Sequence, residues 1–365
     1  MTAMKPVLDL VIDANVVLVL AFCLWWIAHA TVLKSRMKTD YVLQLRLLQS
    51  VLIFVLVSPL ISYLLVAASQ HLWPHVPMTV SDLAVAAYLR GEIAMPALQF
   101  EALLNSRSST LDAFFAGDLP WLMALAVVLL AGAGMLLART FATLLRIHRI
   151  ISGSYVWRRT ARTDIHLSDT ISVPFATRGI LRRHVVIPSA LLTSPSELKV
   201  VLAHEFEHLR QGDVEWELAF ELLRPVLYFN PAFHLWKRRF SQIREFNCDQ
   251  SVLLRLGITP AQYANCLLKF CAKDRSKQQA PTAFNVAFLS AGSTRRAALE
   301  QRLLALAEPR AAASGGMFML CLSAFLAVGV ILAASSVRNP GDWTQDRLTL
   351  STVVNLERLE MINRR

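Results

Sequence analysis

The amino-acid sequence predicts an α-helical membrane protein with four transmembrane helices and an inserted cytoplasmic α+β domain. Three observations support this fold class. The 365 residues are 55% hydrophobic and have a mean hydropathy of +0.45, which is high for a soluble domain. The apolar residues gather in four runs that are long enough to cross a bilayer. A polar segment that combines strand and helix patterns separates the third run from the fourth.

The apolar runs divide the chain into six predicted segments. The runs cover residues 11–33, 47–68, 119–137 with an extension to 145, and 317–337. The first run is too long for a signal peptide and has no small-residue cleavage site, so we expect it to stay in the protein. The predicted segments are two transmembrane helices with a cytoplasmic loop in 1–70, an extracytoplasmic amphipathic segment in 71–118, a third transmembrane helix in 119–145, a cytoplasmic domain in 146–315, a fourth transmembrane helix in 316–337 and a short extracytoplasmic tail in 338–365.

The distribution of charge predicts the orientation in the membrane. The segment 71–118 holds two basic residues against five acidic ones, whereas the first connection is crowded with basic residues: Lys34, Arg36, Lys38 and Arg46. Because Lys and Arg are retained on the cytoplasmic side, the first connection and the polar domain should face the cytoplasm and both termini the outside. The same retention explains the net charge of +11. The lipid bilayer is therefore an expected partner, and direct nucleic-acid binding is not expected.

The outer part of the chain carries two features with alternative interpretations. Asp9, Asp13 and Asn15 stand at the outer end of the first run, where we expect them in the headgroup region rather than in an intramembrane site. The stretches 83–89 and 98–104 are amphipathic. They are either helices on the membrane surface or a lid over the transmembrane helices, and we favour surface helices.

The stretch 194–213 carries the chemistry of the polar domain. It contains His204, Glu205 and His208 in the order HEFEH. On a helix the two histidines are one turn apart, so both imidazoles project from one face and can bind a single metal ion with Glu205 beside it. This arrangement predicts a zinc hydrolase with one Zn²⁺ per chain. Glu205 would take a proton from the attacking water and pass it to the leaving amine.

Flanking residues predict the helix that holds this motif. Ser194 should cap the helix, with Pro195 in its first position and Glu197 completing a capping box. Gly212 is the expected stop. Glu207 points away from the histidine face, so we expect it in solvent. Apolar residues at helical spacing should pack one side of the helix into a core: Leu198, Val201, Leu202, Phe206 and Leu209.

Glu245 is the expected third zinc ligand. It lies thirty-seven positions after His208, and Asp249 follows it by four residues, so both carboxylates share one helical face. One can then bind zinc while the other accepts a hydrogen bond from an imidazole. Three protein ligands leave a fourth position for water, as in catalytic zinc sites. The alternative is a solvated face with ion pairs to Arg244 and Arg255.

Other residues of the domain have weaker claims to the site. Asp213 is a second candidate hydrogen-bond acceptor, or it merely ends the helix. Cys248 is expected to be a small buried packing residue, and five cysteines without a CxxC pair argue against a cysteine zinc site. Three histidines could polarise a substrate carbonyl but are more often structural: His166, His184 and His234. Five apolar residues are expected in the core or on a membrane-facing surface: Phe229, Phe233, Leu235, Trp236 and Phe240.

The polar domain should contain a small sheet followed by helices. Strands are predicted at 164–173 and 184–188, and helices at 218–228, 231–256, 260–271 and 294–307. The segment 272–294 is rich in polar residues and should be a mobile loop. A self-cleavage site would fall there, and the alternative is a simple tether.

With these motifs the chain resembles the integral-membrane zinc proteases of the beta-lactam sensor-transducer family, the BlaR/MecR antirepressors. The resemblance covers about 140–310 and is carried by SVPF at 172–175, RG at 178–179, VIPS at 186–189, LAHEFEHLRQGD at 202–213, FNP at 229–231 and REFNCD at 244–249. It implies a gluzincin-like protease domain in the cytoplasmic membrane of a bacterium. His204, His208 and Glu245 would be the zinc ligands and Glu205 the catalytic base.

The resemblance further implies a protein substrate in the cytoplasm, in this family a DNA-binding transcriptional repressor, cut in some cases after self-cleavage of the protease. The strand ending at Pro188 would be the edge on which an extended substrate lies, near Arg178, Gly179, Val186 and Ile187. After the fourth run, 338–365 leaves no room for a penicillin-binding sensor domain, so beta-lactam sensing is not expected. Quality control of membrane proteins and a catalytically idle receptor or scaffold remain as alternatives, and the oligomeric state is open.

Overall fold

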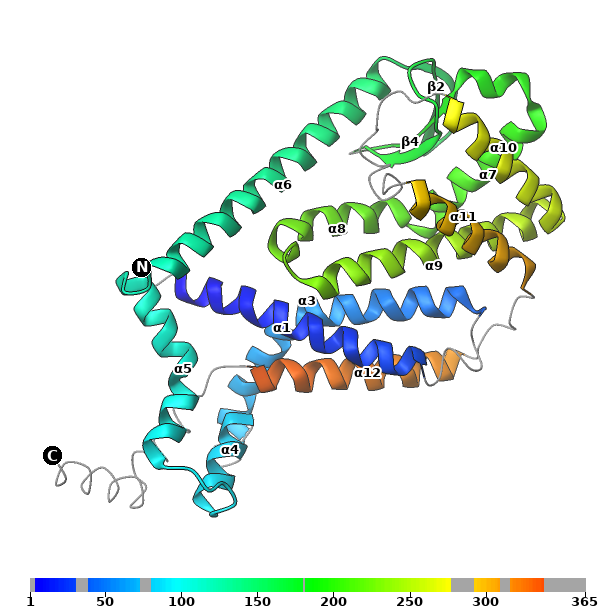
Figure 1. Cartoon of the computed structure of the whole chain (residues 1–365). Helices are drawn as coiled ribbons and strands as arrows, with labels where there is room; N and C mark the ends of the chain where they lie inside the picture. Colours follow the sequence, from blue (N-terminus) through cyan, green and yellow to red (C-terminus); the bar gives the residue numbers. More distant parts are fainter. Residues whose placement is uncertain are drawn as a thin grey trace, which may run out of the picture. The chain divides into compact units, whose positions relative to one another are not determined.

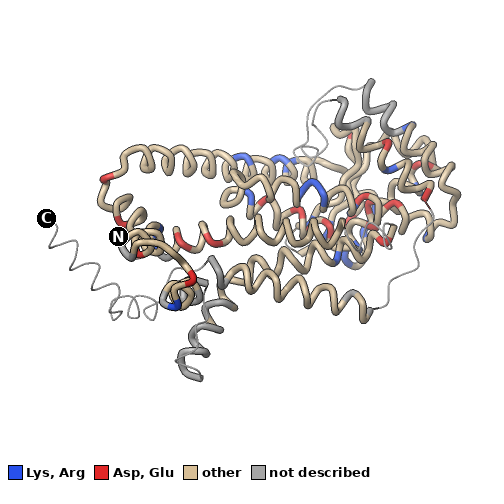
Figure 2. The backbone as a smooth tube through the Cα atoms, turned by 60° about the horizontal axis from the view of Figure 1, so that its bottom comes forward, with Lys and Arg blue, Asp and Glu red and all other residues tan. Residues whose placement is uncertain are grey.

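The computed structural model describes residues 4–30, 39–72, 80–179, 181–276, 292–308 and 316–337. The chain forms two compact units (Figure 1). One, the helical unit, comprises Met1–Thr31, Leu47–Leu130 and Gly315–Arg365. The other, the sheet unit, comprises Val32–Arg46 and Ala131–Ser314. Charged residues are few along the long apolar helices and numerous in the part of the chain that holds the sheet (Figure 2).

Long apolar helices dominate the helical unit, and the second and third of them extend into the sheet unit. These helices are α1 (Met4–Ala28), α3 (Tyr41–Leu72), α6 (Pro120–Ser152) and α12 (Gly316–Val337). Three stretches are long and apolar enough to cross a membrane: Val7–Ala28, Tyr41–Ile61 and Pro120–Ser152. The fourth predicted span is present as the helix α12, but its apolar stretch among the described residues, Leu320–Ala334, is shorter. Three of the four expected spans are therefore present at full length in the described residues.

Close packing joins α1 to α12. A Cβ added to Gly329 would lie 3.1 Å from Leu24 Cδ1, so the two helices approach at a distance that a small residue permits. Small residues serve this purpose in membrane helices, where attraction between helices depends on close contact rather than on exclusion of water.

The segment between the second and third apolar helices is itself helical. It forms α4 (Val80–Leu89) and α5 (Ala97–Ala116), so the second predicted stretch, 98–104, is part of a much longer helix. The rings of Tyr88 and Phe100 stack at 4.3 Å between centroids and hold α4 against α5. Arg107 of α5 donates to Asp13 at 2.6 Å and to Asp9 at 2.8 Å, which ties α5 to α1.

In the part of the chain that the structure describes, the sheet has four strands, two more than the sequence predicts. They are β1 (Tyr155–Arg159), β2 (Thr163–Ser168), β3 (Phe175–Arg178) and β4 (Arg183–Pro188), in the order β1-β2-β4-β3. β2 and β4 are parallel, and each is paired antiparallel with one outer strand. The predicted strand at 164–173 ends at Ser168. β1 escapes sequence analysis because it is mostly exposed and irregular at Trp157, which removes the alternation that marks a half-buried strand.

The expectation that the strand ending at Pro188 forms the sheet edge is wrong for most of β4. Residues 183–186 pair with both neighbouring strands. β4 is instead an interior strand, and Val185, Val186 and Ile187 have no exposed surface. An all-apolar run such as VVI is typical of an interior strand that is covered on both faces.

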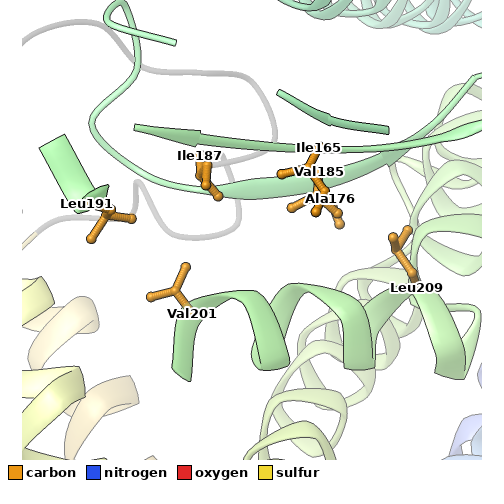
Figure 3. Close-up of a cluster of buried hydrophobic side chains, with 7 residues drawn as sticks. All are labelled: Ile165, Ala176, Val185, Ile187, Leu191, Val201 and Leu209. Atoms are coloured by element: carbon orange, nitrogen blue, oxygen red, sulfur yellow. The ribbon is translucent and has the colours of Figure 1, made fainter. Parts of the chain in front are cut away.

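Five helices of the described residues follow this sheet, and the first of them packs against it. They are α7 (Pro195–Gln211), α8 (Asp213–Leu227), α9 (Pro231–Leu256), α10 (Pro260–Ser276) and α11 (Gly292–Ala307), preceded by a 3-10 turn at Ser189–Thr193. Figure 3 shows the core between sheet and helix, where Val201 and Leu209 of α7 point toward Ile165, Val185 and Ile187. This part of the chain is therefore a small sheet with a set of helices. The predicted loop lies mostly outside the described residues, because α10 extends to Ser276 and 277–291 are not described.

The helix α7 begins and ends near the predicted positions, but one predicted contact is missing. Pro195 occupies the first turn, and Gly212 ends the helix with φ 76°. Ser194 stands at the N-cap without a side-chain hydrogen bond, so the predicted capping box does not form. Glu197 lies 3.6 Å from Lys269 of α10 instead. An ion pair with a neighbouring helix has replaced the local cap.

Candidate metal centre

Two helices bring together the histidines of HEFEH and the carboxylate of Glu245. His204 and His208 are one turn apart on α7, and their Nε2 atoms lie 3.1 Å from each other. Glu245 projects from α9 so that Oε2 lies 3.7 Å from His204 Nε2 and Oε1 lies 3.7 Å from His208 Nε2. The three side chains therefore converge on one point.

These separations fit a tetrahedral metal ion. Ligands at about 2.0–2.1 Å from zinc stand about 3.4 Å apart at the corners of a tetrahedron. The donor atoms of His204, His208 and Glu245 are 3.1 to 3.7 Å apart, which brackets this value. Two imidazoles and a carboxylate are also a donor set that suits Zn²⁺.

Cys248 is a second possible donor from α9. Its sulfur and one ring nitrogen of each histidine lie within 4.8 Å of one another. Sγ lies 3.5 Å from His204 Nδ1 and is also hydrogen-bonded to His208. Burial raises the pKa of the Cys248 thiol to about 12, so without a metal it is a neutral packing group.

Glu245 is already charged for metal binding. Burial alone would raise its pKa, but the charges of Arg302, His208, His204 and Arg244 outweigh burial and lower the pKa to about 2. A charged carboxylate with one oxygen near each Nε2 atom is a better donor than a protonated thiol.

Asp213 orients His208. Its Oδ2 lies 2.6 Å from His208 Nδ1, and the carboxylate is almost fully buried. Gly212 makes this contact possible because its left-handed backbone ends α7 and lets α8 start at Asp213. A hydrogen bond at Nδ1 leaves the lone pair of Nε2 free for a metal.

His204 is oriented through a residue that sequence reasoning missed. The hydroxyl of Tyr263, on α10, lies 3.0 Å from His204 Nδ1 and donates to Asp249 Oδ1 at 2.7 Å. Since the hydroxyl proton is used on Asp249, the tyrosine oxygen accepts from His204 Nδ1, and Nε2 again keeps its lone pair. Asp249 Oδ1 itself is 3.5 Å from His204 Nδ1, so the carboxylate acts mainly through Tyr263.

Arg302 of α11 is the second missed residue. It donates to both carboxylate oxygens of Asp249, at 2.8 and 2.6 Å, and its third nitrogen lies 3.2 Å from Glu245 Oε2. One guanidinium thus fixes two carboxylates. The sequence carries no signal for this role. Arg302 lies fifty-three residues beyond Asp249, in a helix that the sequence predicts only as a link to the fourth apolar run.

Glu205 is buried beside these residues with a raised pKa. Burial raises it to about 7, the Glu245 charge acts in the same direction, and His208, a backbone hydrogen bond from Ala176 and Arg302 oppose the rise. A carboxyl with a pKa near neutrality can both accept and return a proton. The backbone hydrogen bond with Ala176 holds the carboxyl group of Glu205 beside β3, the outer strand next to α7.

Glu207 is not solvated as predicted. Only 2% of its surface is exposed. It lies 3.0 Å from Arg255 and accepts from Gln211 at 2.9 Å. The prediction is wrong because α9 packs over the side of α7 that helical periodicity assigned to solvent.

The substrate residues expected from the resemblance occupy different environments. Arg178 ends β3 and donates to Glu215 at 2.7 Å. A Cβ at Gly179 would lie 3.0 Å from His184 Nε2, so this glycine permits close packing. Val186 and Ile187 are buried in β4, and Pro188 ends that strand. Of the five expected residues, Arg178 and Gly179 stand at the outer strand.

Two of the lone histidines form a pair elsewhere in the sheet. His166 Nε2 lies 3.1 Å from His184 Nδ1, and Asp164 beside them is close enough to complete a metal-binding group. Arg182 lies 2.9 Å from Asp164 and balances its charge. Burial lowers the pKa of both imidazoles, so the pair is neutral and its contact is an ordinary hydrogen bond. His234 bonds the carbonyl of Tyr228 at 2.5 Å.

A motif helix with two histidines and a carboxylate from a second helix, in a chain with long apolar helices, defines the class of membrane metallohydrolases. Comparison with known proteins supports the same class. The family model described as BlaR1 peptidase M56 matches residues 9–306, so the chain belongs to the BlaR1 peptidase M56 family. Membership places the chain in a family of peptidases, and the long apolar helices agree with a membrane protein.

Individual relatives match over shorter stretches. The chain is 30% identical over 96 residues to the regulatory protein BlaR1 of Bacillus licheniformis, which covers 26% of this chain and 16% of that protein. It is 23% identical over 77 residues to the methicillin resistance mecR1 protein of Staphylococcus aureus, 20% of this chain and 13% of that protein. The mecR1 protein of Staphylococcus epidermidis matches to the same extent. The chain thus aligns with less than a fifth of each relative.

Proposed function

We propose that this protein is a zinc endopeptidase of the gluzincin type that is embedded in the bacterial inner membrane. The observation that carries the proposal is the convergence of His204 Nε2, His208 Nε2 and Glu245 at 3.1 to 3.7 Å beside the buried carboxyl of Glu205. His204, His208 and Glu245 would hold one Zn²⁺. Asp213 supports His208 directly, and Asp249 supports His204 through Tyr263.

Each residue has a defined part in peptide hydrolysis. When bound, Zn²⁺ lowers the pKa of a coordinated water toward neutrality and polarises the scissile carbonyl. Glu205 accepts the proton of the attacking water at its carboxylate and delivers it to the leaving amine. Arg302 holds Glu245 and Asp249 in fixed positions, so the ligands do not reorganise during the reaction.

The substrate would lie along β3. Among the residues that the structure describes, this strand pairs with β4 alone, and its Ala176 contacts Glu205. An extended peptide that pairs with the free edge would pass the base and the two histidines. Arg178 and Gly179 at the end of β3 would border the peptide, whereas the interior position of β4 makes Val186, Ile187 and Pro188 supports of the sheet.

The proposed target is a cytoplasmic regulator of the repressor type, and the protease itself is a second target. Family membership supports a role in signal transduction, since one relative is a regulatory protein and others are methicillin resistance proteins. We also propose that the sheet unit faces the cytoplasm and both termini the outside, because of the basic residues in the first connection. The expected self-cleavage segment falls largely on 277–291, outside the described residues.

The proposal is tested by measuring zinc and proteolysis in the same preparations. Wild type is compared with Glu205→Gln and with the control Glu207→Gln, which changes a buried carboxyl of the same helix that does not face the metal centre. We expect one zinc in all three, and defined cleavage products of the chain or of cytoplasmic proteins in wild type and the control only.

Three outcomes would separate the alternatives. Absence of zinc from wild type purified without chelator would overturn the site. Zinc without any products would favour an idle receptor. Broad degradation of unfolded membrane proteins, rather than cleavage at one or two positions, would favour quality control.

A further inference from the structure

The outer face of α8 is apolar along the whole helix. The structure describes every residue of α8, and its exposed positions are Leu218, Leu222 and Val226. They are four residues apart and form one stripe along the helix. Phe229, in the turn after α8, and Leu235, in the first turns of α9, are about half exposed near the same end of the hairpin. A helix that faces water normally carries charged residues on this side.

The charged residues of α8 are at most partly exposed, and each is paired. Glu217 lies 3.0 Å from Lys237 and 3.1 Å from Arg244. Glu221 pairs with Arg224 and Lys237. The two acidic residues of the first turn pair with the sheet and with the metal centre, since Glu215 accepts from Arg178 and Asp213 bonds His208. Charge has therefore been removed from the stripe and neutralised within the domain, as in helices that meet a non-aqueous environment.

The end of the same hairpin packs against an apolar helix that is long enough to cross a membrane. A Cβ added to Gly132 of α6 would lie 2.5 Å from the hydroxyl oxygen of Tyr228, so the tyrosine ring fits against the glycine. Gly132 lies within the candidate span Pro120–Ser152. The next charged residue of α6 is Arg139, seven positions further, which corresponds to about 10 Å of helix. Between these two residues, Met135 and Leu137 are exposed.

We propose that the apolar end of the α8–α9 hairpin, formed by Leu222, Val226, Phe229 and Leu235, is immersed in the acyl region of the bilayer beside α6. Contact with Gly132 fixes the depth of the hairpin relative to the apolar part of α6, about two turns inside the first charge. Helices that lie in the membrane interface bury their apolar face by about 5–10 Å. A helix face in the acyl region cannot expose charged side chains, and α8 has no charged residue at an exposed position.

The metal centre is thereby held at a set distance from the membrane. α8 begins at Asp213, which bonds His208, and its 15 residues span about 22 Å. The inserted end and the metal centre are thus the two ends of one helix, so a polypeptide that reaches the centre must come close to the membrane surface. This inference rests on exposed surface and packing, and it does not depend on peptidase activity.

Spin-label accessibility in the full chain, reconstituted in phosphatidylcholine–phosphatidylglycerol vesicles, tests the proposal. Single cysteines replace Leu222 and Val226, and the control is Leu254→Cys at the other end of α9, where 66% of the side chain is exposed. In the background Cys23, Cys271 and Cys321 become alanine, while Cys248 and Cys266 are buried and stay. Zinc content of each labelled protein verifies that the domain is folded.

Immersion predicts that labels at 222 and 226 collide often with molecular oxygen, which dissolves in lipid, and rarely with a water-soluble nickel chelate. The ratio of the two collision rates should be several-fold higher than at position 254. Labels that meet the nickel chelate as often as the control would overturn the proposal, because the face would lie in water. Exclusion of both reagents would overturn it as well, because a second copy or another protein would then cover the face.

Discussion

At the residue scale, a chain of hydrogen bonds supports each candidate zinc ligand. His208 depends on Asp213, His204 depends on Tyr263 and Asp249, and Glu245 depends on Arg302. Each supporting group is buried or nearly buried, so its charge or hydrogen bond acts in a medium of low polarity, where loss of its partner costs more free energy than in water. The supports should therefore influence metal affinity nearly as strongly as the ligands do.

Replacing Arg302 by Met should lower both stability and zinc affinity. The substitution leaves the Asp249 charge buried without its bidentate partner, which destabilises a protein by about 3–5 kcal/mol. Loss of a supporting contact lowers metal affinity by about 10- to 100-fold. Thermal unfolding and competition with a chelating dye measure the two effects. The control, Arg255→Met, removes the partner of buried Glu207, and it should lower stability without changing zinc affinity. Equal zinc affinity in both variants would contradict the role of Arg302.

Replacing Tyr263 by Phe should weaken zinc binding with little change in packing. The ring stays, but His204 Nδ1 loses the hydroxyl that fixes its tautomer, and we expect about a 10- to 100-fold loss of zinc affinity. The same competition titration checks the result. Tyr155→Phe on the exposed strand β1 is the control and should bind zinc as wild type does.

Glu205 predicts the pH dependence of cleavage. Burial raises its pKa to about 7 in the metal-free protein, and below that pH most of the carboxyl is protonated and unable to accept a proton. Activity should therefore fall as the pH falls. A bound cation would lower this pKa, so the midpoint of the acid limb should lie at or below about 7. Initial rates of product formation across pH 4–9, roughly the range over which carboxyl and imidazole groups titrate, measure it. A midpoint well above neutrality would exclude Glu205 as the base.

At the element scale, two short connections determine the geometry of the metal centre. Gly212, with φ 76°, turns the chain so that α8 starts at Asp213 next to the last turn of α7. Asn230 caps α9 by accepting from the backbone N–H of Ala232 and starts the helix that carries Glu245. The helices provide the spacing of the ligands, and these connections provide their relative placement.

Gly212→Ala should lower stability and zinc affinity together. A left-handed backbone costs a residue with a Cβ about 1–2 kcal/mol, and any relaxation of the turn displaces Asp213 from His208. Gly257→Ala is the matched control, because Gly257 ends α9 with φ 62° and is followed by the connection to α10. The control should lose similar stability in thermal unfolding and retain zinc affinity in the dye competition. Loss of zinc affinity in both would point to a general effect of destabilisation.

At the scale of the whole molecule, the metal centre joins elements that lie far apart in the chain. α7 and α9 supply the ligands, and α8, α10 and α11 supply the residues that hold them. Bound metal should therefore stabilise the sheet unit as a whole rather than one helix.

Removal of the metal should lower the unfolding temperature of the sheet unit. A ligand present at 100 times its Kd contributes about 2.7 kcal/mol to stability, and a chelator removes this contribution. Differential scanning calorimetry of the full chain, with and without chelator and after addition of zinc, measures the change. His204→Ala should unfold at one temperature in all three conditions. A chelator effect of equal size in that variant would place the responsible metal elsewhere.

The sequence by itself determined the features that depend on local periodicity. Apolar runs predicted the long helices, spacing of four residues put His204 with His208 and Glu245 with Asp249, and Gly212 marked the end of α7. Only the tertiary structure decided which residues support these ligands and which surfaces are covered. Tyr263 and Arg302 lie 59 and 53 residues from their partners, Glu207 is buried by a helix distant in sequence, and β4 is interior because β3 pairs beside it. Such facts have no local signal, because a side chain's environment is created by whatever elements the fold packs against it.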